Sequence, residues 1–226
     1  MKLPEFFDLV PRLRVQDPLA TLLGSAEDGL IEYSYADAVR LMGHSCPTVA
    51  SAYWLTCLAL ERLYPDALPQ RGGVQVEFRE DARIGSTGVV ATVVQMLTGA
   101  AGGTGFKGIN GRFNRVGLIR YEPDLLCCMR ITRLDTRAAV EANADLSLVP
   151  QDPAIDTLLA RCLAPDATDA EVQRLGALWQ ERVRHLLLDL GRDPGVFIVR
   201  TAEVRQLPRR VGAGPRVSPA TEPHLR

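Results

Sequence analysis

Alternating apolar and polar residues predict several short strands. The clearest is Val74-Gln75-Val76-Glu77-Phe78, which follows Gly72-Gly73 and alternates strictly, as expected where successive side chains point to opposite faces of a sheet. Other short apolar-rich or alternating runs predict strands at residues 30–35, 113–121, 125–132 and 196–200. Glu122-Pro123-Asp124 predicts a hairpin-like turn that joins residues 113–121 to residues 125–132.

Apolar residues at helical spacing predict helices between these strands. The strongest pattern covers residues 48–63, directly after Pro47, which stands where a helix favours proline. Thr168 and Glu171 form a capping-box pattern that opens a long helix reaching residue 190. Four shorter helices are predicted at residues 17–24, 36–42, 86–97 and 155–163. The fold class is therefore predicted to be α+β, a mainly antiparallel sheet packed with helices, plus a C-terminal helical extension.

The chain divides into three predicted regions. Residues 1–134 contain most of the strands and form an α+β core. Residues 135–204 start with a polar connector at 135–153 and continue as a helical extension with one short strand. Residues 205–226 are rich in Pro, Arg, Gly and Ser, a composition that buries little apolar surface and predicts a flexible tail.

Composition excludes several classes of partner. The formal net charge of the 226 residues is −1, so no basic field points to nucleic acid. Apolar runs are too short to span a membrane, and the first residues lack the pattern of a secretory signal. The five cysteines are odd in number and irregularly spaced, which indicates reduced thiols and a cytoplasmic location.

The turn Gly43-His44-Ser45-Cys46-Pro47 is the best candidate site. Unpaired amides at a helix start stabilise a thiolate, so Cys46 is a candidate nucleophile. His44 is positioned to accept the thiol proton or to join Cys46 on a soft metal such as zinc. A purely structural role for both residues remains open. Cys57 lies ~16 Å from Cys46 at the rise of an α-helix and cannot share one metal with it.

Gly103-Thr104-Gly105-Phe106-Lys107-Gly108 matches the string G-x-G-x-x-G. A dinucleotide-binding loop follows a strand and opens a helix, whereas this loop follows a predicted helix and enters a predicted strand. Dinucleotide binding is therefore rejected. Backbone amides of the loop and Lys107 remain candidates for contacting an anion, and a flexible connector is the alternative.

Several short motifs occur in the order of a known family. The Gly43–Pro47 turn resembles a Gly-His-x-Cys-Pro-Gly signature, and Glu80-Asp81-Ala82, after strand 74–78, resembles an Asn-Asp-Ala-Cys motif. Residues 95–99, Gln-Met-Leu-Thr-Gly, and residues 106–110 are similar to Gln-x-Leu-Thr-Gly-Cys and Gly-Lys-Gly-Asn. Over residues 36–121 the chain thus resembles the FmdE-like family, which takes its name from a component of formylmethanofuran dehydrogenase.

The resemblance implies an α+β core, a homodimer, and a metal, often zinc, near the His-x-Cys turn. It also implies a link to molybdenum enzymes and one-carbon metabolism. Met42, Arg83 and Ala100 stand where relatives carry a histidine or cysteines, so His44 and Cys46 are the remaining soft ligands. Two protein ligands imply an open metal site, completed by water or by a second copy of the chain.

Three functional hypotheses follow. The first is soft-metal binding by His44 and Cys46. The second is a metal-free thiol enzyme or small-anion binder, with Cys46 as nucleophile, His44 as proton partner, and Arg83 and Lys107 as anchors for the anionic ligand. The third is haem binding, because a Cys-Pro pair with a nearby His or Met can ligate iron.

Overall fold

Helix α3 (Pro47–Leu63) is the central helix of the structure, a computed structural model that describes residues 2–203. Pro47 begins the helix without cost, because the first turn of a helix leaves its N–H groups unbonded in any case. Thirteen of its 17 residues are buried, so α3 is enclosed on nearly every side and not along one stripe only. The helix predicted at residues 48–63 is confirmed.

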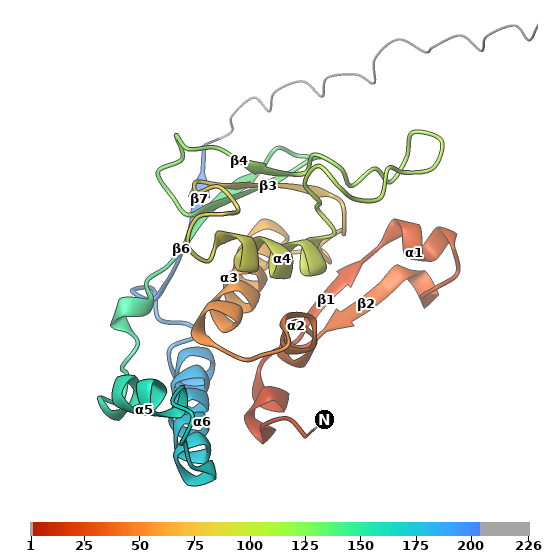
Figure 1. Cartoon of the computed structure of the whole chain (residues 1–226). Coiled ribbons are helices and arrows are strands. Elements are labelled where there is room, and N and C mark those ends of the chain that lie inside the picture. Colours follow the sequence, from red (N-terminus) through yellow and green to blue (C-terminus); the bar gives the residue numbers. More distant parts are fainter. Residues whose placement is uncertain (1, 204–226) are drawn as a thin grey trace, which may run out of the picture.

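A five-stranded sheet lies across α3, in the order β4-β3-β5-β6-β7 (Figure 1). Its strands are β3 (Val74–Phe78), β4 (Ile119–Tyr121), β5 (Met129–Arg133), β6 (Ala139–Ala144) and β7 (Phe197–Ala202). Every neighbouring pair is antiparallel except β3 and β4, which run parallel. The mainly antiparallel α+β class predicted from the sequence is confirmed.

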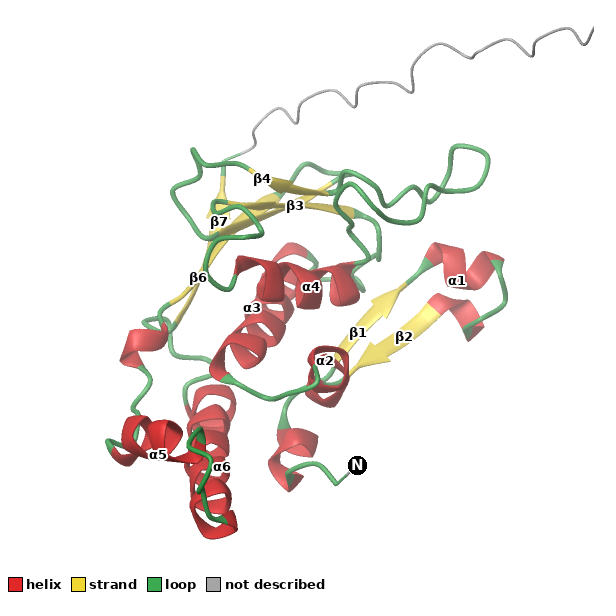
Figure 2. Cartoon of the chain, in the orientation of Figure 1, coloured by secondary structure: helices red, strands yellow, loops and turns green. Residues whose placement is uncertain are grey.

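Helices cover one face of this sheet. Helix α4 (Thr87–Thr98) lies between the sheet and α2 (Tyr35–Met42), and α3 passes beside it (Figure 2). Glycines in the left-handed conformation end both α2 and α4, at Gly43 with φ 77° and at Gly99 with φ 69°, where a residue with a Cβ would be strained. No helix within residues 2–203 has the length and apolar character needed to cross a bilayer.

The predicted hairpin around Glu122-Pro123-Asp124 is wrong. Strands β4 and β5 are not neighbours, because β3 lies between them. The connection crosses the end of β3: the N–H of Glu122 donates to Phe78 O, and the N–H of Arg79 donates to Cys128 O. The predicted strand 113–121 is also shortened to three residues, since Phe113 and Gly117 have positive φ values that break an extended chain.

The region after residue 134 contributes to the same sheet. The sequence predicts β6 as part of a polar connector, because its alanine-rich segment gives a weak apolar signal. Helices α5 (Ala154–Cys162) and α6 (Asp169–Arg184) follow, and a π-helical turn, His185–Asp189, replaces the end of the predicted long helix. The boundary expected at residue 134 therefore falls between two paired strands. The tail expected at 205–226 lies outside the described residues.

An antiparallel ribbon precedes α2. Strands β1 (Leu13–Gln16) and β2 (Leu30–Tyr33) pair along their lengths, and the short helix α1 (Pro18–Leu22) caps one end of the ribbon. The sequence pattern does not predict β1. The N-terminal residues also form a 3₁₀ turn at Glu5–Leu9, and two further 3₁₀ turns occupy Glu27–Gly29 and Leu146–Leu148.

Candidate functional site

The His-Ser link between α2 and α3 holds the candidate site. Gly43 closes α2 in the left-handed conformation, and Cys46 is the N-cap of α3. His44 and Ser45 are therefore the only residues between the two caps, and both ends of the turn are fixed by helix geometry. The Gly-His-Ser-Cys-Pro pattern encodes this arrangement locally, with glycine after one helix and proline at the start of the next.

The Cys46 sulfur faces the unpaired amides of α3. Its Sγ atom accepts the N–H of Val49 at 3.4 Å, in the position where serine or threonine oxygen usually caps a helix. The side chain is half-buried. The sulfur therefore satisfies one of the N–H groups that the first turn of α3 leaves unbonded.

The imidazole of His44 is exposed and is oriented by the backbone. Its Nδ1 atom lies 3.0 Å from Met42 O. Because a carbonyl oxygen only accepts, this hydrogen bond requires the proton to be on Nδ1, and the neutral ring then keeps its free lone pair on Nε2. Histidines that bind metals in proteins are commonly oriented in this way, by donating the other ring N–H to a carbonyl or carboxylate.

Helix α6 holds the turn in place through hydrogen bonds to Ser45. Trp179 Nε1 and Gln180 Nε2 donate to Ser45 O at 3.1 and 3.2 Å, and Ser45 Oγ donates to Gln180 Oε1 at 2.9 Å. The Ser45 hydroxyl is also 2.8 Å from the buried hydroxyl of Tyr35, whose pKa burial raises above its ordinary value. Sequence reasoning missed these three positioning residues, because Trp179 is separated from Ser45 by 134 positions.

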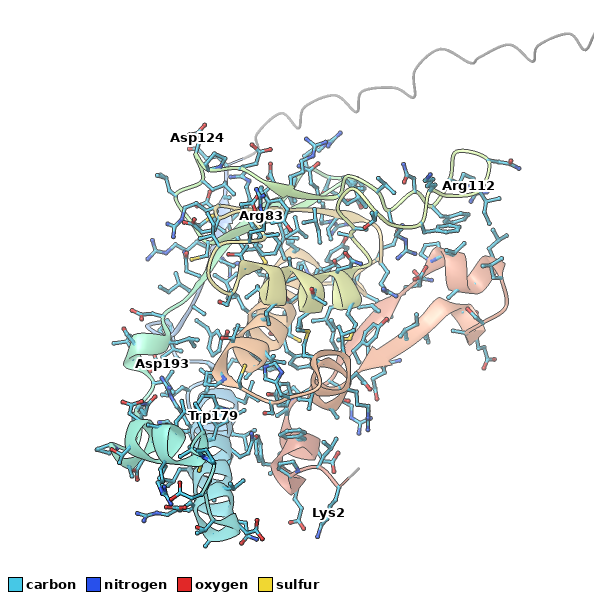
Figure 3. The ribbon with its side chains drawn as sticks, in the orientation of Figure 1. Lys2, Arg83, Arg112, Asp124, Trp179 and Asp193 are labelled. Carbon is cyan, nitrogen blue, oxygen red and sulfur yellow. The ribbon has the colours of Figure 1, made fainter. Side chains whose placement is uncertain are left out.

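Arg83 lies apart from this turn (Figure 3). Arg83 has a side chain 90% exposed and pairs with Asp81 at 2.9 Å. In Figure 3 it lies near the sheet, far from Trp179, which contacts Ser45 at the start of α3. Lys107 is exposed on the loop between α4 and β4. The anion-binding alternative therefore loses Arg83 as an anchor beside Cys46.

Among residues 2–203, no third metal ligand accompanies His44 and Cys46. Within residues 2–203, no group of three or more His, Cys, Asp or Glu side chains is placed to hold one metal ion. His185 lies on the π-helical turn, where its Nδ1 atom is 2.7 Å from Asp189 Oδ2. His44 and Cys46 therefore stay a predicted pair of donors, and a metal bound by them would need further donors from outside residues 2–203 or from solvent.

The remaining thiols have contrasting environments. Cys57 is buried in α3, and burial raises its pKa to about 12. Burial also raises the pKa of Cys127, whereas the neighbouring Cys128 is exposed. Since thiolates are the reactive form, the raised pKa makes Cys57 and Cys127 less reactive than cysteines of ordinary pKa.

Alkylation is expected to distinguish these cysteines. With iodoacetamide at pH 8, the folded protein should be labelled at Cys128 much faster than at Cys57 and Cys127, because Cys128 is exposed and the other two are buried. Peptide mass spectrometry after timed quenching measures each rate, and a urea-unfolded sample gives the reference in which all sites react alike. Labelling of Cys57 as fast as Cys128 in the folded protein would contradict the burial of Cys57 in α3.

No protein-family model matches the chain, and no curated protein matches it significantly. The FmdE-like resemblance consequently rests on the motifs in the sequence alone.

Proposed function

We propose that this protein binds a soft metal ion, zinc or a related transition metal, at an open site formed by His44 and Cys46. One observation carries the proposal: the His44 Nδ1–H group is held by Met42 O at 3.0 Å, so Nε2 is free to bind a metal. Cys46 supplies a thiolate two positions later, with its charge favoured by the start of α3. The FmdE-like motifs support the same pair of ligands.

The donor set suits a soft metal but does not complete its coordination. Imidazole nitrogen and thiolate sulfur are preferred zinc ligands, and a closed structural site uses four of them. Two protein donors leave open positions for water, for a ligand, or for a second copy of the chain in a homodimer. A metal bound here would supply Lewis acidity at those open positions.

The protein's own residues orient the two ligands. Met42 O fixes the ring of His44, the N–H of Val49 fixes the sulfur of Cys46, and α6 holds the intervening Ser45. Such supporting hydrogen bonds set the direction and basicity of metal ligands. From the FmdE-like resemblance, the proposed setting is one-carbon or redox-enzyme metabolism in the cytoplasm.

Metal analysis tests the proposal. Full-length protein purified without a histidine tag is expected to contain about one equivalent of zinc or another transition metal by elemental mass spectrometry. Cys46→Ser and His44→Gln should each lower metal content at least tenfold, because either change leaves a single protein ligand on the metal. Serine is itself a good N-cap, so Cys46→Ser leaves α3 intact.

Matched variants make the metal result specific. Cys128→Ser removes an exposed thiol and His185→Gln removes a histidine remote in sequence from the turn, and both should keep the metal content of the unchanged protein. Metal-free protein, or metal loss that is equal in all four variants, would overturn the proposal.

A thiol-based function is the second candidate, and the hydrogen bond from Val49 N to Cys46 Sγ favours it. In this hypothesis Cys46 is the nucleophile and His44 its proton partner. Rapid alkylation of Cys46 in metal-free protein, slowed by His44→Gln, would support it. An absorption spectrum of the same sample tests haem binding, since a bound haem gives an intense Soret band.

A further inference from the structure

A cavity lies beside the C-terminal end of α4, and its wall includes Leu41 in the last turn of α2. It has a volume of about 370 Å³, within the range of about 300–1,000 Å³ that is usual for small-molecule sites. The C-terminal end of α4 contributes Gln95 and Met96 to its wall, and the glycine-rich loop contributes Phe106. This loop runs beside the end of α4 in Figure 1. Two arginines, Arg71 and Arg115, complete the polar part of the wall.

The two arginines share a single buried carboxylate. Arg115 Nη2 lies 2.7 Å from Asp17 Oδ1, and Arg71 Nη1 lies 3.4 Å from Asp17 Oδ2. All three side chains are largely withdrawn from water, at 9% exposed for Arg115, 16% for Arg71 and 7% for Asp17. Two positive charges against one negative charge leave an excess of one unit. Burying a charge without a partner is costly.

Helix α4 compensates only part of this excess. Arg71 Nη2 donates to Met96 O at 2.9 Å, at the negative end of the helix, where the dipole is equivalent to about half a charge. Arg71 Nε, also buried, has no hydrogen-bond partner among the described residues. Burial lowers the pKa of Arg71, and the neighbouring Arg115 adds to this effect.

The charged part of the cavity wall is wholly basic. Both arginines line it, whereas Asp17 does not, and none of the residues in its wall is acidic. Gly99 keeps the guanidinium of Arg115 close to the backbone, since a Cβ at this position would overlap Arg115 Nη1. The apolar part of the wall includes Leu41 and Phe106, which are 47% and 42% exposed.

We propose that this cavity binds a small organic monocarboxylate, with its carboxylate on Arg71 and Arg115 and its apolar body against Phe106 and Leu41. Guanidinium groups match carboxylate oxygens in geometry. An excess of at most one positive charge favours a monoanion over the doubly charged form of phosphate. Neither His44 nor Cys46 lines this cavity, so the proposal does not rest on the proposed metal site.

Benzoate is the probe for the test. Titrated into full-length protein and followed by calorimetry, it should bind with a dissociation constant below about 1 mM. Benzamide, which has the same ring but no charge, should bind at least tenfold more weakly, and inorganic phosphate should also bind at least tenfold more weakly. Equal affinity for benzamide, tighter binding of phosphate, or no binding of benzoate would each overturn the proposal.

A charge placed on the cavity wall tests the location. Gln95 is exposed on α4 and lines the cavity, so Gln95→Glu puts a carboxylate beside the arginines without disturbing the core. It should weaken benzoate binding tenfold or more. Gln173→Glu, an equivalent change on exposed α6, should leave binding unchanged.

Two further variants complete the test. Phe106→Ala should weaken benzoate binding severalfold by removing apolar contact. Cys46→Ser should leave benzoate binding intact, so failure of the metal proposal and failure of this one are distinguishable. Binding that is insensitive to both Gln95→Glu and Phe106→Ala would overturn the assignment to this cavity.

Discussion

Replacing Asp17 by alanine is expected to lower the free energy of unfolding by about 3–5 kcal/mol, the cost of breaking a buried ion pair. The change leaves Arg71 and Arg115 buried without a countercharge. It also removes the cap of α1, because Asp17 Oδ1 accepts the N–H groups of Leu19 and Ala20. The two effects act in the same direction, so this single substitution is among the most damaging that the chain offers.

Urea unfolding followed by circular dichroism measures the loss. Arg12→Met provides the control, since it breaks an ion pair with Glu32 whose side chains are 53% and 47% exposed, and such surface pairs contribute little. A midpoint for Asp17→Ala equal to that of Arg12→Met would show that the buried cluster does not stabilise the fold.

Leu60→Ala is expected to cost about 2–5 kcal/mol, the range for removing a large side chain from a packed core. Leu60 is 1% exposed on α3. Because α3 is packed on nearly every side, neighbouring side chains cannot easily relax into the cavity that the truncation leaves. The urea midpoint should fall while the slope of the transition stays constant.

Leu163→Ala is the matched control for this core substitution. Leu163 is 79% exposed, and its truncation should change the midpoint little. If the two leucine variants had the same stability, the position of α3 at the centre of the core would be wrong.

Local signals in the sequence are sufficient to predict α3 and β3. Pro47 marks the start of α3, strict alternation marks β3, and Thr168 with Glu171 marks the start of α6, where both capping bonds are present. These features depend on residues only a few positions apart. The His44–Cys46 turn is recognisable for the same reason, because two helix caps and two candidate ligands fall within one short segment.

Features that depend on distant contacts could not be predicted. The insertion of β3 between β4 and β5 is decided by pairing across the whole sheet, and the short Glu122–Asp124 turn gave a misleading local signal. The anchoring of Ser45 by α6 joins residues without any shared motif. Likewise Asp17 and Arg115, which are 98 positions apart, become partners only in the folded chain.

The late position of β7 in the sequence has a consequence for synthesis on the ribosome. Strand β6 pairs with β7. Trp54 of α3 also donates its indole N–H to Gly191 O at 2.6 Å, in the segment that leads to β7. Residues 191–202 leave the exit tunnel long after α3 and β3, so the nascent chain carries the apolar surface of α3 incompletely covered during much of its translation. Recruitment of a chaperone that binds exposed apolar segments is expected in that interval, and release should coincide with emergence of Phe197–Ala202.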